Sequence, residues 1–189
     1  MAETDGGATG PVRVSGRLRV HLGLGSNLGG RWAHLARATQ ALRAAGEEVA
    51  ISPVYETAPV GGPEGQGPYL NAVVRLWLTG TPAEVLDLAR SLEAAAGRTR
   101  EVRWGPRTLD VDVLYLEAER VGDGALVPVR VDTPELTVPH PRLGERAFVL
   151  VPLEDVSPEL VDPGWRERLG GTAAVAAVHR VGELVAGAR

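Results

Sequence analysis

Residues 69–92 decide the fold class, and they read YLNAVVRLWLTGTPAEVLDLARSL. The first ten are rich in valine, leucine and aromatic side chains, which predicts a strand over Tyr69–Leu78. Thr81, Pro82 and Glu84 then give three signals of a helix start: an N-cap hydroxyl, a proline at the first helical position, and a glutamate three residues after the cap. A helix is therefore expected directly after the strand, and its apolar face would consist of Val85, Leu88, Ala89 and Leu92.

The segments on either side complete a recognisable order. Alternating apolar residues predict a first strand over Leu18–Gly25, and helical spacing predicts a helix over residues 32–42. Strands are expected over Glu48–Thr57 and Leu109–Leu116. The resulting β-α-β-β-α-β order predicts an α+β fold with a ferredoxin-like βαββαβ core, a largely antiparallel sheet flanked by helices, with the helices on one face. A doubly wound parallel sheet is disfavoured because strict βαβα alternation is absent.

The rest of the chain is expected to add short elements to this core. They are a hairpin in Val121–Val131 around Asp123-Gly124, an extended segment over Val138–Pro141, and helices over Arg146–Asp155 and Thr172–Val178. Residues 1–16 are polar and glycine-rich, which predicts a flexible tail before a single domain over residues 17–189.

Composition excludes several kinds of chemistry. The chain has 189 residues, of which 44% are hydrophobic, as expected of a globular protein. It has no cysteine, so disulfides, thiolate nucleophiles and Cys-ligated zinc are excluded. All 20 basic residues are arginine, so phosphate groups must be bound by guanidinium forks and a Walker-type lysine is excluded. With no signal-peptide or membrane-helix pattern and a net charge of −4, a cytoplasmic protein that binds neither membranes nor nucleic acid is expected.

A glycine-rich segment, GLGSNLG over residues 23–29, follows the first strand. A dinucleotide-binding fingerprint would need its third glycine at position 28, where the chain has Leu28. The favoured interpretation is a glycine turn between a strand and a helix.

The segment GRTREVRWGPRTLDVD, residues 97–112, is the strongest candidate for chemistry. Four of the 20 arginines lie within ten of its residues, on an aperiodic polar stretch. Asp110 and Asp112 follow on a strand, where residues two apart point to the same face at a spacing of about 6.6 Å. Val111, Val113 and Tyr115 are expected on the opposite face, in the core.

Paired carboxylates repel each other unless a cation lies between them, and hard oxygen ligands suit Mg²⁺. Two such ions would clamp an in-line phosphoryl displacement. The pattern therefore predicts a site for a nucleoside triphosphate with magnesium. The alternative is two surface aspartates beside a solvated basic loop.

The ten residues Arg103–Asp112, RWGPRTLDVD, resemble the signature of the 6-hydroxymethyl-7,8-dihydropterin pyrophosphokinase family. Other segments agree in order: Gly25–Gly29, Tyr55–Pro59 with Tyr69–Asn71, and Leu136–Pro141 followed by Arg146–Phe148. The resemblance covers about residues 19–160. It implies a ferredoxin-like fold and transfer of the β,γ-diphosphate of ATP to the hydroxymethyl group of the dihydropterin, with release of AMP, in folate biosynthesis.

The resemblance also implies roles for individual residues. Asp110 and Asp112 would hold two Mg²⁺ ions, and with Arg98 and Arg107 they would form the catalytic set. The residues expected along ATP, the co-substrate, are Glu93, Arg100, Arg103, Trp104, Arg107, Val113, His140 and Arg146. Those expected around the pterin are Thr57, Ala58, Pro59, Val60, Tyr69, Asn71 and Phe148. The implied partners are these two small molecules, and a monomer is expected.

Other interpretations stay open at this point. Phe148, the one phenylalanine, could fill the core; His140 could be a structural hydrogen bonder; and Trp104 could pin its loop to the surface. The whole domain could be an RNA-binding module that uses the arginine loop, although the low aromatic content and negative charge speak against it. It could also be a ligand-sensing module, which would not need paired aspartates.

Overall fold

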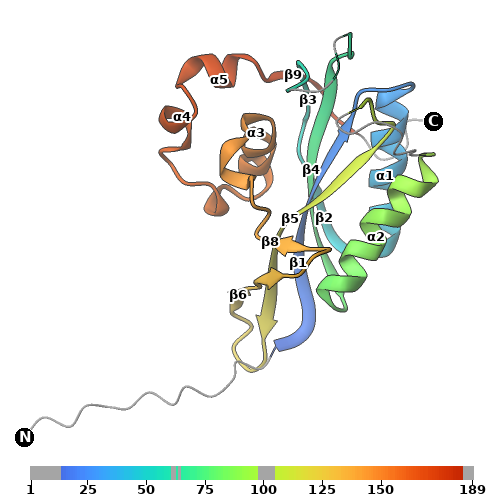
Figure 1. Cartoon of the computed structure of the whole chain (residues 1–189). Coiled ribbons are helices and arrows are strands. Elements are labelled where there is room, and N and C mark those ends of the chain that lie inside the picture. Colours follow the sequence, from blue (N-terminus) through green and yellow to red (C-terminus); the bar gives the residue numbers. More distant parts are fainter. Residues whose placement is uncertain (1–13, 61–62, 64, 98–104, 185–189) are drawn as a thin grey trace, which may run out of the picture.

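The structure is a computed structural model that describes residues 14–60, 63, 65–97 and 105–184. Its helices and strands are shown in Figure 1. They are, in order, β1 (Val14–Ser26), α1 (Arg31–Ala45), β2 (Glu47–Ile51), β3 (Val54–Thr57), β4 (Tyr69–Thr79), α2 (Pro82–Ala95), β5 (Asp110–Arg120), β6 (Leu126–Pro128), β7 (Val131–Asp132), β8 (Thr137–Val138), the 3₁₀ turn η1 (Leu143–Glu145), α3 (Ala147–Val156), the 3₁₀ turn η2 (Pro158–Leu160), α4 (Trp165–Arg168), α5 (Thr172–Ala176) and β9 (His179–Gly182).

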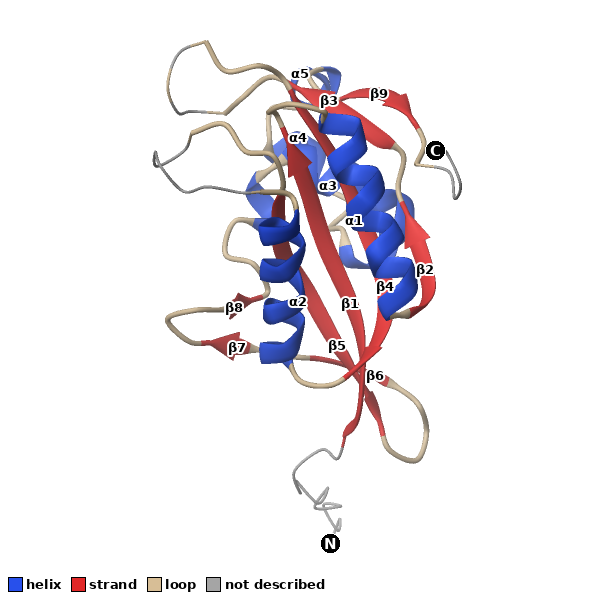
Figure 2. Cartoon of the chain, turned by 90° about the vertical axis from the view of Figure 1, so that its right-hand side faces the viewer, coloured by secondary structure: helices blue, strands red, loops and turns tan. Residues whose placement is uncertain are grey.

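The sheet confirms the predicted fold class. Its strands run in the order β6-β5-β1-β4-β3-β9, with β2 also paired to β4, and every pairing among the described strands is antiparallel. The inner order β5-β1-β4-β3 is the arrangement that a βαββαβ chain adopts when each helix crosses over a neighbouring strand. Figure 2 shows α1 and α2 lying across the same face of this sheet. Helix α2 begins with the predicted capping box, in which Thr81 and Glu84 exchange hydrogen bonds.

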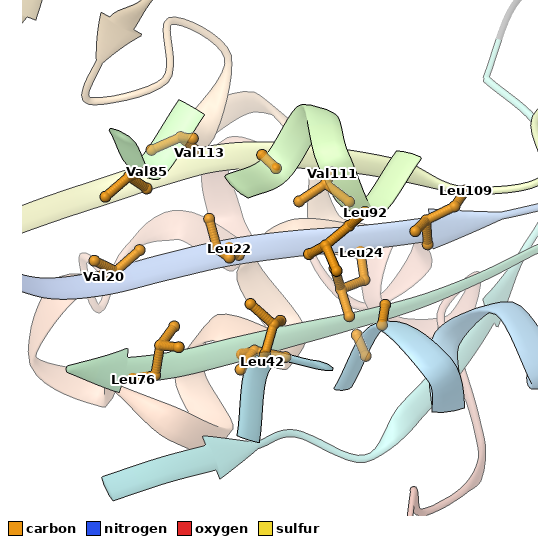
Figure 3. Packing of buried hydrophobic residues seen from close by; sticks show 14 of the residues in the cluster. Val20, Leu22, Leu24, Leu42, Leu76, Val85, Leu92, Leu109, Val111 and Val113 are labelled. Atoms are coloured by element: carbon orange, nitrogen blue, oxygen red, sulfur yellow. The ribbon is translucent and has the colours of Figure 1, made fainter. Parts of the chain in front are cut away.

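Apolar side chains pack on both faces of the sheet. On one face Val20, Leu22 and Leu24 of β1 pack with the buried sides of α1 and α2 (Figure 3). On the other, Val73 and Leu114 pack with Leu153 of α3 and the fully buried Trp165. Helices α3 to α5 therefore cover the face opposite α1 and α2 (Figure 1), and the prediction of helices on one face holds only for the βαββαβ core.

The strand predicted over Glu48–Thr57 is two strands. The chain breaks at Ser52-Pro53, because proline has no N–H to donate to a ladder. The Ser52 hydroxyl accepts a hydrogen bond from the Val73 N–H at 2.9 Å, which keeps the interrupted segment attached to β4. Both β2 and β3 pair with β4 on either side of the break.

A bulge in β5 corrects the prediction for Tyr115. Leu22 pairs with Val113 and His21 pairs with Tyr115, so the ladder skips Leu114. One extra residue reverses the alternation of faces along a strand. Val111 and Val113 lie in the core beneath α2, as predicted, whereas Tyr115 lies on the opposite face, where its ring is 6.2 Å from that of His21.

Smaller differences follow from the pairing partners. The predicted turn around Asp123 is present, but the strands that it joins are the end of β5 and β6, not two strands inside Val121–Val131. Strand β9, which pairs with β3, and the one-turn helix α4 were not predicted. Residues 14–16, expected in the tail, belong to β1. Within the described part of the chain, no helix is both long and apolar enough to span a bilayer.

His21 ties helix α3 to the central strand. Its imidazole is fully buried, and its Nε2 lies 2.8 Å from the hydroxyl of Ser157, which caps the end of α3. Burial, with the nearby charge of Arg19 and a smaller contribution from Arg75, lowers the pKa of His21 from 6.5 to about 3. The folded protein therefore holds this imidazole in its neutral form.

This burial predicts a pH dependence of stability. Between pH 6.5 and about 3 the unfolded chain binds a proton at His21 that the folded chain does not. The free energy of unfolding should therefore fall as the pH falls through this window, by up to about 1.4 kcal/mol per pH unit from this group. Denaturant unfolding at several pH values should show a correspondingly shallower dependence for His21→Gln. Parallel curves for the two proteins would contradict the neutral, buried state of His21.

Candidate active site

A pocket opens where the end of β1 and the end of β3 meet the starts of β4 and β5. Its floor is formed by these strands, and its walls by the segment after β3 and by the start of α3 with the segment before it. The described residues that line it are Gly23, Leu24, Gly25, Thr57, Ala58, Val60, Tyr69, Asn71, Ala72, Val73, Arg107, Asp110, Asp112, Leu114, Arg142, Arg146, Phe148 and Val149.

Two glycines on the central strand form part of the floor, and Gly25 keeps it open. In the β1 ladders Gly25 lies between Asp110 and Asn71, and Gly23 lies between Asp112 and Val73. A Cβ atom on Gly25 would stand 3.6 Å from Asn71 Oδ1 and 3.8 Å from Asp110 Cβ, so a side chain there would occupy the pocket.

These glycines correct an interpretation of the sequence. Gly23 and Gly25 fall both in the strand predicted over Leu18–Gly25 and in the turn predicted over residues 23–29. Both are strand residues, and the connection between β1 and α1 comes only after Ser26. Their neighbours Leu22 and Leu24 face the core. The sequence therefore contained a signal for the pocket: where leucines and glycines alternate along a strand, the glycine positions leave one face without side chains.

The two aspartates lie on the same face of β5, as predicted, and both line the pocket. Asp110 forms an ion pair with Arg107. Asp112 Oδ2 lies 3.4 Å from Arg146 Nη1 and 3.9 Å from His140 Nε2. Burial raises the pKa of Asp112, the negative charge of Asp110 raises it further, and His140 and Arg146 oppose this shift. The pair is therefore a site where added positive charge is favourable.

The donor set fits a hard divalent cation that shares its ligands with a substrate. Within the described ranges there is no group of three or more His, Cys, Asp or Glu side chains arranged to hold a metal. Two carboxylates alone do not complete a coordination shell, but Mg²⁺ is commonly bound by one or two carboxylates together with water and substrate phosphates. Asp110 and Asp112 are suited to that kind of site.

The residues predicted around a flat ring come together in the same pocket. Tyr69 and Asn71 project from β4, Thr57 ends β3, and Phe148 begins α3. Asn71 is buried, and its Nδ2 donates to the Thr57 hydroxyl at 3.0 Å, which fixes the orientation of its amide. The Arg146 guanidinium lies 5.6 Å from the centre of the Phe148 ring. Ala58 and Val60 also line the pocket, whereas Pro59 is not among the described lining residues.

Only some of the residues predicted along the nucleotide lie at the pocket. Arg107 and Arg146 line the pocket, and His140 lies beside Asp112. Glu93 and Val113 are not among the described lining residues: Val113 faces α2, and Glu93 lies on α2 itself. The buried carboxylate of Glu93 accepts a hydrogen bond at 2.9 Å from the N–H of Val111, between the two aspartates. Arg98, Arg100, Arg103 and Trp104 lie outside the described residues.

Sequence reasoning missed several pocket residues. They are Gly23, Leu24, Gly25, Ala72, Val73, Leu114, Arg142 and Val149. Most are small or apolar and became visible only when the strands were paired. Arg142 is the one charged residue among them, and it lies between the matched segments Leu136–Pro141 and Arg146–Phe148.

Paired aspartates on a ferredoxin-like sheet, with arginines and aromatic rings around them, are the arrangement expected of an ATP-dependent phosphotransferase. Residues 21–158 match the family described as 7,8-dihydro-6-hydroxymethylpterin-pyrophosphokinase (HPPK). The chain belongs to this family, which confirms the resemblance seen in its sequence.

Curated relatives agree with this assignment, and each is named a 2-amino-4-hydroxy-6-hydroxymethyldihydropteridine pyrophosphokinase. The protein of Bacillus subtilis is 42% identical over 139 residues, covering 72% of this chain and 77% of its own length. That of Methylorubrum extorquens is 45% identical over 148 residues, covering 77% and 87%. That of Mycobacterium tuberculosis H37Rv is 46% identical over 141 residues, covering 74% and 73%.

Proposed function

We propose that this chain transfers the β,γ-diphosphate of ATP to the 6-hydroxymethyl group of 6-hydroxymethyl-7,8-dihydropterin, giving the dihydropterin diphosphate and AMP in folate biosynthesis. The observation that carries the proposal is one pocket in which the Asp110–Asp112 pair, three arginines and two aromatic rings meet, in a member of the pyrophosphokinase family. An RNA-binding or ligand-sensing module is not favoured, because the family and the named relatives are enzymes.

Asp110 and Asp112 are proposed to hold Mg²⁺, with two ions as the family resemblance implies. Bound there, magnesium would neutralise the triphosphate and polarise its phosphoryl oxygens. Arg107 and Arg146 lie at the same carboxylates, where their guanidinium groups are placed to orient phosphate oxygens and stabilise charge that develops on them. Positioning and electrostatics are the main contributions that a protein makes to phosphoryl transfer.

The pterin is proposed to bind between Tyr69 and Phe148, with Asn71 at its edge. A flat heteroaromatic ring gains most from aromatic faces, and both rings line the pocket. The Asn71 amide is already oriented by Thr57, so it can form hydrogen bonds with the polar edge of the ring without loss of side-chain freedom on binding. Backbone groups of residues 57–60 are proposed to contribute further hydrogen bonds.

The remaining nucleotide contacts are proposed from the family resemblance. They concern Arg98, Arg100, Arg103, Trp104 and His140. For Glu93 the structure suggests a second role, because its hydrogen bond to Val111 holds the strand between the two aspartates. We also propose that the chain forms one domain, as predicted over residues 17–189 but beginning with β1 at Val14, since β9 is part of the same sheet as β1.

The metal assignment is tested by Asp112→Asn and Asp110→Asn. Either change should lower the release of AMP, measured with ATP and hydroxymethyl-dihydropterin, by at least about a hundredfold, because a carboxylate ligand is lost. The fold should survive Asp112→Asn, since the raised pKa shows that the charged form of Asp112 is unfavourable in the folded chain.

The matched control is Asp87→Asn, which changes an exposed aspartate on α2 and should leave turnover unchanged. Near-normal AMP release by either site variant at saturating magnesium would contradict the metal assignment. A wild-type chain that releases no AMP would contradict the proposed function itself.

The pterin site is tested by Phe148→Ala. The change should weaken pterin binding by about 1–3 kcal/mol, through lost stacking and burial, and affect nucleotide binding much less. Calorimetry with each ligand separately measures both effects. Leu160→Ala is the control, because Leu160 packs on the same apolar cluster as Phe148 without lining the pocket. Equal losses for both ligands in Phe148→Ala would assign that ring to the core instead.

A further inference from the structure

The pocket contains a third arginine, Arg142, which neither the family signature nor the sequence pattern singled out. Its backbone position is well defined. The N–H of His140 donates to the carbonyl oxygen of Leu114 at 2.9 Å, which anchors the segment to β5 two residues beyond Asp112. The N–H of Arg142 then donates to His140 Nδ1 at 3.1 Å. The aspartate-bearing strand therefore sets the place of Arg142.

The side chain of Arg142 differs from those of the other two pocket arginines. Arg107 and Arg146 are paired with Asp110 and Asp112. Arg142 instead has its Nε 3.4 Å from Glu145 Oε2, and the two side chains are 44% and 65% exposed. A long contact between two such exposed groups is weak. The Arg142 guanidinium can therefore leave Glu145 for a stronger anion at little cost.

The guanidinium group of Arg142 shares the pocket with those of Arg107 and Arg146. Three guanidinium groups thus line one pocket with two carboxylates. An anion that binds among them would relieve the repulsion between the arginines.

We propose that Arg142 binds the diphosphate group that is transferred, first as the β,γ-phosphates of ATP and then on the product. The inference rests on the proposed function. A planar guanidinium matches two phosphate oxygens at once, whereas the pterin carries no charge for it to pair with. Arg142 lines the pocket from the short segment that joins His140 to Arg146, and the side chains of both of those residues lie at Asp112, so Arg142 lies on the side of the pocket where the phosphates are proposed to bind.

The test compares two nucleotides that differ in the transferred group. With magnesium present, calorimetry measures binding of AMP and of an ATP analogue with a methylene bridge between the α- and β-phosphorus atoms. Arg142→Met should bind the analogue about tenfold more weakly than wild type, the loss of one charge-assisted hydrogen bond at a half-exposed site. Its affinity for AMP, which lacks the diphosphate, should be unchanged.

Further variants separate binding from structure. Arg142→Lys should recover only part of the loss, because it keeps the charge but not the fork. Glu145→Gln should bind the analogue as tightly as wild type or more tightly, because it removes the competing carboxylate. Arg168→Met is the matched control: Arg168 is 52% exposed and paired with Asp162 on the α4 side of the molecule, and its removal should change neither affinity. All these variants keep the backbone N–H of residue 142, which donates to His140 Nδ1, so the position of His140 should not change.

Two results would overturn the proposal. One is an unchanged affinity of Arg142→Met for the ATP analogue. The other is an equal loss for the analogue and for AMP, which would place Arg142 at the nucleoside or the α-phosphate. Both differ from a failure of the proposed function, in which the wild-type chain itself would release no AMP from ATP and the dihydropterin.

Discussion

The site depends on the antiparallel pairing of β1 with β4 on one side and β5 on the other. That register puts Gly25 between Asn71 and Asp110, and Gly23 between Val73 and Asp112. Because β1 has no side chains at Gly23 and Gly25, groups on its two neighbouring strands face one shared space beside Gly25. The intervening Leu22 and Leu24 lie in the core on the other face, so the same short segment secures the sheet and opens the pocket.

The helices on the second face complete the site. Helix α3 brings Phe148 and Arg146 over the strands, and it is held there by apolar packing around Leu153 and by the contact between His21 and Ser157. The segment before α3 is attached to β5 through His140 and Leu114. Acidic and basic groups from different elements thus meet at one edge of the sheet, where their charges compensate each other.

Much of this could be predicted from the sequence, because the decisive signals are local. The capping box at Thr81, the helical spacing in α1 and the Asp-x-Asp alternation in β5 each depend on a few neighbouring residues. Features that depend on distant partners could not be predicted. The bulge that turns Tyr115 toward His21 is a feature of the pairing between β5 and β1. The four residues of β9 form a strand because they pair with β3. Arg142 became a pocket residue only because the backbone of His140 is anchored to Leu114.

The central claim is that the floor left open by the glycines is where the substrates bind, and filling it is the most direct test. Gly25 has a backbone conformation that other residues adopt, and a new side chain would meet Asn71, Tyr69 and Asp110 at ordinary contact distances. The measurement is the affinity of Gly25→Val for the dihydropterin by calorimetry, beside its melting temperature. We predict a loss of at least about tenfold in affinity, with a folded protein, because the side chain occupies the pocket. Wild-type affinity in a folded Gly25→Val would contradict the claim.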